Sequence, residues 1–225
     1  MAKKVNETRT SIEELNESLS GIEKKVEDNK KMIVWVVAAI VAIAVMILGY
    51  IYLIQNPNLE KAKEEIAKAD VDYTLGQDSI ALNEYMAVAD NYSNDAANRA
   101  GLNAAIILYQ QGKYEEAITY IKKFDAVGTL VGPASQALLG DCYVNLEKYD
   151  DAVKAFDKAI SLSDENELYT PLFILKKANV LREQGKFAEE AKILQSIKDK
   201  YPNFIAGYQV DVDKYIERAK AQAGK

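Results

Sequence analysis

The feature that most constrains the fold is a motif that returns about every 35 residues along the last three quarters of the chain. Its clearest copy is Leu139-Gly140-x-x-Tyr143, followed by Ala152-x-x-x-Phe156 and then Ala159. The small residues allow two helices to cross closely, and the aromatic rings fill the space between one helix pair and the next. A unit of this length cannot bury its apolar face alone, so the motif predicts a stack of helix pairs.

Three weaker copies are in phase with this one. The segment 112–117 (GKYEEA) aligns with 147–152 (EKYDDA) at an offset of 35 residues, and Gly76 with Ala81 precedes it by 36. Downstream, 185–187 (GKF) restarts the motif and Pro202 closes it. In this last copy Glu190 occupies the position of the small alanine and Ala191 follows it, so we expect the second helix there to be rotated or shifted by one residue.

From about Glu60 to Pro202 the chain resembles tetratricopeptide repeats. The resemblance implies an all-α solenoid of about four helix pairs, and the apolar periodicity of 3.6 residues within the repeats supports the same fold class. A final helix is expected to cap the solenoid with one apolar face, formed by Ile205, Tyr208, Val212, Tyr215, Ile216 and Ala219. No alternating pattern long enough for a sheet is present in the sequence.

A second domain-defining feature is the uncharged run of 23 residues from Met32 to Ile54. As a helix it spans roughly 35 Å, enough for a bilayer core of about 30 Å. Trp35, Tyr50 and Tyr52 lie near its ends, where aromatic rings prefer the membrane interface. The run is too long for a cleaved signal peptide and 31 residues precede it, so we predict a single uncleaved transmembrane helix over 32–54 rather than a buried soluble helix.

The lysines around this run predict its orientation. Four lysines precede it closely and three follow at a greater distance, and Lys30-Lys31 abuts it directly. The bias favours a cytoplasmic N-terminus. In a bacterium this places the protein in the inner membrane as a single-pass protein with residues 55–225, the repeat domain, in the periplasm.

The polar arm, residues 1–31, has seven basic and seven acidic residues. Within it, apolar residues recur at intervals of 3, 4, 3 and 4, as in the seam of a coiled coil: Ile12, Leu15, Leu19, Ile22 and Val26. Two interpretations stay open. The arm is either a short coiled coil that makes the protein a homo-oligomer or a disordered tail with a transient amphipathic helix.

Composition excludes several classes of function. The chain has a net charge of −6, all of it on residues 55–225, and an acidic surface argues against nucleic-acid binding. It contains no histidine, which removes the usual general base and the commonest metal ligand. The single cysteine, Cys142, is either a small packing residue or a reactive thiol. With no phosphate-binding glycine loop and no nucleophile elbow in the sequence, we expect neither an enzyme nor a cofactor.

In tetratricopeptide domains the first helix of each pair lines the concave face. The resemblance therefore implies a protein-binding groove with an apolar and polar lining suited to an extended or helical segment. The inward positions are Leu102, Ile106, Tyr109 and Gln110 in the second copy, Ala137, Asp141, Val144 and Asn145 in the third, and Leu175, Asn179, Arg182 and Glu183 in the fourth. The lysine, asparagine and arginine clamp that grips chaperone tails in some members is not reproduced.

Taken together, the arm, the membrane helix and the repeats resemble the ancillary subunit family of the Sec translocon. The C-terminal motifs, which include 185–187 (GKF), Tyr201-Pro202 and 214–218 (KYIER), are similar to the version found in Bacteroidetes. The resemblance implies that partners are a translocon subunit, periplasmic chaperones or unfolded clients. Two alternatives remain: an assembly factor of an envelope complex, and a mitochondrial-type import receptor with a cytosolic repeat domain.

The lysine bias predicts topology directly. Alkaline phosphatase fused after Lys225 should be active in bacteria, because this enzyme folds to its active form outside the cytosol. A fluorescent cytosolic reporter at the same point should stay dark. An inactive phosphatase together with a fluorescent reporter would contradict the predicted orientation.

Overall fold

The computed structural model describes residues 29–125, 128 and 130–224. The predicted seam of the arm, Ile12 to Val26, lies outside these residues. The chain divides between Asn58 and Leu59 into two units, which are described separately.

The first unit contains helix α2 (Lys30–Tyr50) and a π-helical turn, η1 (Ile51–Gln55). The turn leads without a break into α3 (Asn56–Thr74), and the Asn56 N–H donates to the carbonyl of Ile51, five residues earlier. This π-turn directly precedes Pro57, which lacks an N–H and whose ring would clash with a carbonyl one helical turn earlier. Among the described residues, the helix from Lys30 to Thr74 is the one that is long and apolar enough to cross a membrane.

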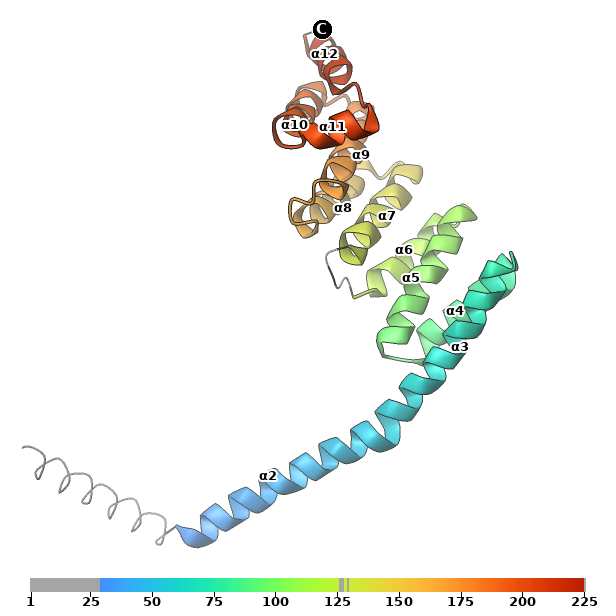
Figure 1. The fold of residues 1–225 in the computed structure, drawn as a ribbon, viewed down its shortest axis with the longest axis vertical. Coiled ribbons are helices and arrows are strands. Elements are labelled where there is room, and N and C mark those ends of the chain that lie inside the picture. The colour runs from blue at the N-terminus through green and yellow to red at the C-terminus, as the bar shows by residue number, and fades with distance from the viewer. Residues whose placement is uncertain (1–28, 126–127, 129, 225) are drawn as a thin grey trace, which may run out of the picture. The chain divides into compact units, whose positions relative to one another are not determined.

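The second unit consists of helix pairs that follow one another along the stack (Figure 1). The pairs are α3 with α4 (Asp78–Asn91), α5 (Asp95–Gln110) with α6 (Tyr114–Lys123), α7 (Val131–Asn145) with α8 (Tyr149–Leu162), and α9 (Tyr169–Glu183) with α10 (Phe187–Lys200). Two further helices follow, α11 (Pro202–Tyr208) and α12 (Val212–Ala223). The described residues contain no strand, and the all-α solenoid of four helix pairs is confirmed.

Close helix crossings hold each pair together. Ala81, Ala117 and Ala152 occupy the same position of the motif, and each is 0% exposed. The tightest approach joins α7 and α8, where a Cβ on Gly140 would lie only 2.6 Å from the ring of the buried Phe156. The glycine of the motif is therefore required because the aromatic ring occupies the space of a side chain.

The turn between the two helices of each pair contains one residue in the left-handed conformation. Gly76, Gly112 and Gly185 have φ angles of 73°, 75° and 73°. The third pair places Glu147 at this position, with φ of 56°. The turn itself is preserved, because the next N–H, that of Lys148, still bonds to the carbonyl of Tyr143 at 2.9 Å as in a Schellman motif.

The prediction that the second helix of the fourth pair is rotated or shifted by one residue is wrong. The Glu190 N–H bonds to the Lys186 carbonyl just as the Ala152 N–H bonds to the Lys148 carbonyl, so α10 keeps the register of the other repeats. Glu190 is 1% exposed, and its Oε1 accepts a hydrogen bond of 2.7 Å from Nη2 of Arg218. The large side chain fits because α12 supplies a charge partner for it.

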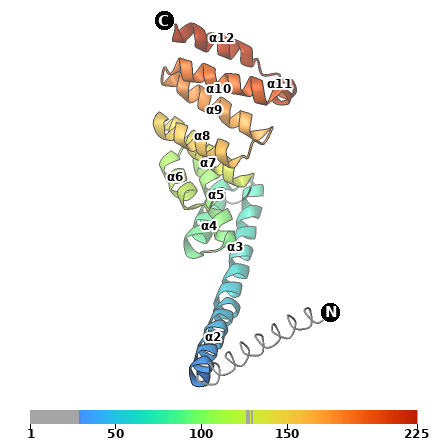
Figure 2. The same ribbon diagram turned by 90° about the vertical axis from the view of Figure 1, so that its left-hand side faces the viewer.

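The prediction of a single capping helix is also wrong, because the cap consists of two helices, α11 and α12. Gln209, with φ of 52°, separates α11 from α12, and the Asp211 side chain caps α12 by accepting from the Lys214 N–H. Residues from both sides of the break still close the stack: Phe204, Val212, Ile216 and Ala219 are buried. Tyr208 is 55% exposed, so it does not belong to the apolar face. Figure 2 shows α12 alongside α10 at this end.

The Gly140 crossing predicts a stability difference between two buried glycines. Gly140→Leu should lower the free energy of unfolding by about 1–3 kcal/mol, because the side chain displaces the Phe156 ring. Gly101→Ala is the matched control, since its Cβ would meet Ala89 at an ordinary 3.6 Å. This control should be neutral or stabilising by up to about 1 kcal/mol through helix propensity. Urea unfolding of both variants checks this, and a Gly140→Leu variant as stable as the parent would contradict the crossing.

The turn at Glu147 predicts a stabilising substitution. Glu147→Gly should raise the free energy of unfolding by about 0.5–1 kcal/mol, because glycine adopts positive φ without steric cost. The converse change, Gly185→Ala, should lower it by about 1 kcal/mol, since no atom lies within 4 Å of the new Cβ and only the backbone conformation is penalised. Relative to the parent, the midpoint of chemical denaturation should rise in Glu147→Gly and fall in Gly185→Ala. A loss of stability in Glu147→Gly would overturn this explanation.

Candidate protein-binding groove

The first helices of the four pairs present one equivalent face. Asp70, Ile106, Asp141 and Asn179 are related by the repeat offsets of 36, 35 and 38 residues and lie on α3, α5, α7 and α9. We call the surface around these positions the first-helix face. Contacts between successive first helices, described below, show that its side chains meet across the repeat boundaries.

Of the twelve predicted inward positions, nine make up the predicted groove; all nine lie on this face and none is fully buried. Six are half-buried: Leu102, Ile106, Tyr109, Asp141, Val144 and Arg182. The other three, Gln110, Asn145 and Asn179, are exposed. Ala137, by contrast, is 5% exposed and packs in the core with Phe156, so it supports the solenoid and offers no binding surface.

Ion pairs join the first helices at two of the three repeat boundaries. At the first boundary Arg99 of α5 pairs with Asp70 of α3. At the third, Nζ of Lys176 lies 2.8 Å from both carboxylate oxygens of Asp141. Burial raises the pKa of Asp141, and the Lys176 charge opposes that rise. Each of these charges is therefore matched within the solenoid.

The middle boundary carries no such pair among the described residues. The Tyr109 hydroxyl faces the Asn145 amide and the Asp141 carboxylate, and burial is the main cause of its raised pKa. The Tyr109 ring also packs on Tyr114, with ring centroids 5.6 Å apart. Half-buried Leu102, Ile106 and Leu138 lie on this part of the face. The first-helix face thus combines an apolar middle with charged boundaries on either side.

No hydrogen bond or ion pair within the described ranges connects Leu102, Gln110 or Asn179 to the other groove residues. Arg182 pairs with its neighbour Glu183 at 3.2 Å. Tyr109 is half-buried beside the main core, so it supports folding as well as offering a contact. The side chains that are exposed and not engaged across the face are therefore the better positions to test for binding.

Sequence reasoning missed the residues that complete this face. A cleft of about 310 Å³ lies between α3, α4 and α5. It is lined by Asp70, Tyr73, Thr74, Tyr85, Asn103, Ile106 and Ile107. Asp70 and Tyr73 were detectable, because they precede Ile106 and Tyr109 by the same 36 residues. Lys176 and Arg99 carry no signal of their own, since their role depends on contacts between repeats.

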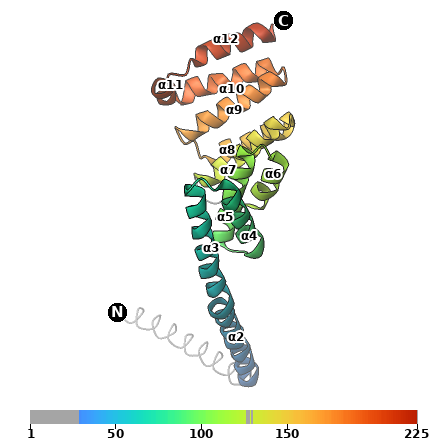
Figure 3. The same ribbon diagram turned by 90° about the vertical axis from the view of Figure 1, so that its right-hand side faces the viewer.

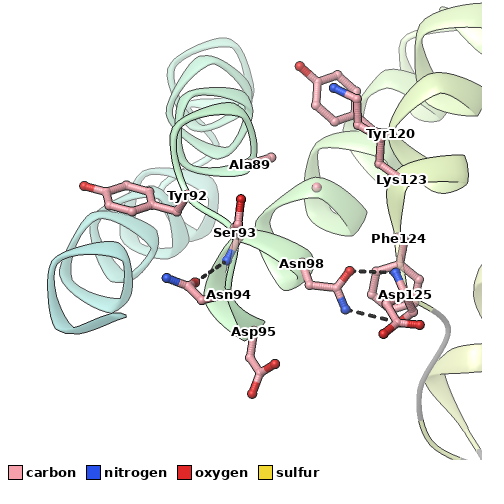
Figure 4. Close-up of a pocket in the computed structure, with 12 residues that line it drawn as sticks. Ala89, Tyr92, Ser93, Asn94, Asp95, Asn98, Tyr120, Lys123, Phe124 and Asp125 are labelled. Carbon is pink, nitrogen blue, oxygen red and sulfur yellow. Dashed lines mark hydrogen bonds between the residues drawn. The ribbon is translucent and has the colours of Figure 1, made fainter. Parts of the chain in front are cut away.

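A second cleft, of about 440 Å³, lies where α4, α5 and α6 meet at one edge of the stack (Figure 4). Several of its polar groups are engaged within the protein. The Asn98 side chain bonds to both the N–H and the carbonyl of Asp125, and the Asn94 side chain accepts from the Ala97 N–H. The Tyr120 hydroxyl donates to Asp90, just outside the cleft. These hydrogen bonds hold the loops at this edge in place, so we interpret Asn94 and Asn98 as structural supports.

Cys142 is buried on α7, with 0% exposure. Burial raises the pKa of its thiol to about 12, and the nearby Asp141 charge adds to this rise. The thiolate, which is the reactive form, is therefore scarce at neutral pH. The packing interpretation of this cysteine fits these observations.

Comparison with known proteins supports the fold class. Residues 77–159 match the family model described as anaphase-promoting complex, cyclosome, subunit 3, and residues 137–203 match a tetratricopeptide repeat model. The crystal structure of MamA protein is 21% identical with a TM-score of 0.59, covering 73% of this chain and 84% of that one. The crystal structure of the kinesin light chain TPR-like repeats of Podosopora anserina is 15% identical with a TM-score of 0.54, covering 73% of this chain and 87% of that one.

No curated protein sequence matches the chain. At these identities the solved structures establish the fold alone. The repeat domain, from α3 to α12, is a helical solenoid of the tetratricopeptide type. Domains of this type generally mediate protein–protein interactions. Neither the two family models nor these solved structures name a translocon subunit.

The Asp141–Lys176 pair predicts a pH-dependent defect. Lys176→Met keeps the apolar stem but removes the charge, so the pKa of Asp141 should rise further above its unfolded value. An ionised carboxylate with a raised pKa destabilises the fold, and protonation relieves this. The variant should therefore be less stable than the parent by about 1 kcal/mol at pH 7, and the deficit should shrink as pH falls toward 4.

Urea midpoints at both pH values measure this change. Lys154→Met is the matched control, because Lys154 pairs with the exposed Asp151 one turn away on its own helix. Its effect should stay within about 0.5 kcal/mol at either pH. A Lys176→Met deficit that does not vary with pH would show that the pair does not control the protonation of Asp141.

Proposed function

We propose that this protein is a membrane-attached binding scaffold whose first-helix face holds extended or partly folded protein segments. The observation that carries the proposal is the lining of that face. It has a half-buried apolar middle, and the exposed amides of Gln110 and Asn179, for which no hydrogen bond is found within the described ranges, are available to a peptide backbone. Apolar pockets alternating with amides suit an extended chain, which offers side chains and backbone groups in turn.

The membrane attachment rests on the helix that begins at Lys30. Its apolar side chains are exposed within the first unit, with Trp35 at 77%, as expected for a surface in contact with lipid. We propose a cytoplasmic N-terminus and a periplasmic repeat domain in a bacterial inner membrane. The tether has a physical consequence for binding, because it raises the effective concentration of weakly bound partners at the membrane.

The partner class follows from the resemblance of the whole layout to the ancillary translocon subunits. We propose that the clients are proteins emerging from the Sec channel and that periplasmic chaperones receive them. A scaffold for transient clients should have a wet, partly polar surface. The ion pairs and amides of the first-helix face are consistent with that requirement. The proposal assigns the protein no catalytic role.

The test blocks the face without touching the core. Gln110→Arg with Asn179→Arg places two long side chains at exposed positions of α5 and α9. Chemical crosslinking in native membranes, followed by quantitative mass spectrometry, should recover translocon subunits, chaperones or clients at least tenfold less well than with the parent chain. The melting temperature should be nearly unchanged, because neither residue is buried.

The matched control is Thr119→Arg with Ser161→Arg, two exposed positions on the second helices α6 and α8. Its crosslinked partners should equal those of the parent. If both double variants retain the same partners, and substitutions at Leu15 and Leu19 remove them, the arm is the recognition element and the proposal is wrong.

A further inference from the structure

A cleft of about 350 Å³ lies at the boundary between the second and third helix pairs. Its wall contains Lys122 of α6, Gln136 of α7 and Lys158 of α8. Figure 3 shows these three helices in the middle of the stack. The boundary departs from its neighbours in its hydrogen bonding and in its charge.

Gln136 carries a buried amide without a partner. The residue is 6% exposed and makes no hydrogen bond within the described residues, yet its amide atoms stay accessible from the cleft. At the equivalent position the second and fourth pairs have Gly101 and Ile174, which are apolar and buried. The first pair has Glu65, which accepts a hydrogen bond of 2.9 Å from the Tyr92 hydroxyl. An unpaired buried amide destabilises a fold, so a ligand explains Gln136 better than folding does.

The lysines of this cleft are not matched by acidic residues, unlike those at the other two boundaries. At the first boundary Lys123 pairs with Asp90 at 3.2 Å, and at the third Lys177 pairs with Asp157 at 2.6 Å. Lys158 is equivalent to Lys123 by the offset of 35 residues. Within the part of the chain that the structure describes, however, neither lysine of the cleft forms an ion pair. The positive charge of the middle boundary is therefore available to a ligand.

The exposed Asp125 reduces this positive charge without cancelling it. Two lysines and one aspartate line the cleft, so the net charge of its lining is +1 (2 − 1), in a chain whose net charge is −6. The Lys122 ammonium lies 5.7 Å from the centre of the Tyr143 ring, a contact that leaves its charge unneutralised. The cleft therefore favours an anion.

We propose that this cleft binds the phosphate group of a small phosphate ester. Its three donors come from three helices, and a phosphate group offers three acceptor oxygens. Lysine ammoniums are compact point charges, and no arginine among the described lining residues supplies the planar fork that matches a carboxylate. Leu139 and Leu162 form an apolar part of the wall, which suits the carbon portion of an ester. The site is independent of the first-helix face and of the membrane helix.

Lysine acetylation of the full chain in nonionic detergent micelles, read out by mass spectrometry, tests the site. Saturating inorganic phosphate should slow the acetylation of Lys122 and Lys158 about fivefold relative to chloride at the same ionic strength, because bound lysines are withdrawn from the reagent. Lys113 is the reference, since it is exposed and forms no ion pair within the described ranges, and its rate should not change. Equal rates in phosphate and chloride would overturn the proposal, and so would equal protection by acetate.

Two variants separate a binding role from a structural one. In chloride, Gln136→Leu should melt at the temperature of the parent or above it, because the buried amide is removed, but phosphate should no longer protect Lys158. Lys158→Met should lose the rise in melting temperature that phosphate gives to the parent. Lys154→Met is the matched control, one turn away on α8, and should keep that rise. A full phosphate response in either Gln136→Leu or Lys158→Met would contradict the inference.

Two further probes identify the source of the phosphate group. Glycerol 3-phosphate presents it on a soluble ester, and phosphatidylcholine vesicles that contain phosphatidate present it on a lipid surface. The probe that protects Lys122 and Lys158 at the lower concentration of phosphate groups represents the source. If neither probe protects them, the cleft binds no phosphate ester and the proposal is wrong.

Discussion

Each helix pair in this protein buries its apolar surface only by packing against the pair beside it. The main core illustrates this, since one buried cluster runs from Ala62 on α3 to Ala155 on α8 and includes side chains of three successive pairs. The buried cluster of the fourth pair likewise extends beyond that pair, to α11 and α12. Close approach is therefore a condition of stability, and it explains why alanines with no exposed surface recur at the crossing position and why Phe156 rests directly on Gly140.

The same constraint governs the two ends of the stack. At the C-terminal end α11 and α12 cover the last pair, and the buried Glu190 is paired with Arg218 of α12. Removing one partner of such a pair leaves an uncompensated buried charge, so the pair specifies how α12 docks. At the other end, the described residues include no helix that covers α3. Val71 and Leu75 stay exposed there.

Much of this fold was predictable from local patterns. The offsets of 35 and 36 residues, the glycines in three of the four turns and the motif around Gly140 indicate the number of helix pairs, because each feature reports a steric requirement within a few residues. The break at Gln209 was missed: Gly207 lies two residues before it, but the residue that takes the left-handed conformation is a glutamine, which does not favour it. Glu190 was misinterpreted for a related reason: the charge that accommodates it lies 28 residues further on, in another helix.

The candidate site was also predictable only in part. Periodicity placed the nine groove residues on one face, but it gave no information on which of them are engaged. The partner of Asp141 is Lys176, 35 residues away, and Tyr109 shares its environment with Asn145 of the next pair. Such contacts depend on the angle between successive pairs, which the sequence of one repeat does not encode. The first-helix face is thus a product of stacking, as the core is.

The central claim is that the first-helix face, and no other surface of the solenoid, holds partner proteins at the membrane. Site-specific photocrosslinking in living cells tests it most directly, with the photoreactive side chain placed at Asn179 on α9 or at Ser161 on α8. The account predicts discrete adducts with proteins of the export machinery or their clients from Asn179, and none above background from Ser161. Equal adducts from the two positions, or adducts from Ser161 alone, would contradict it.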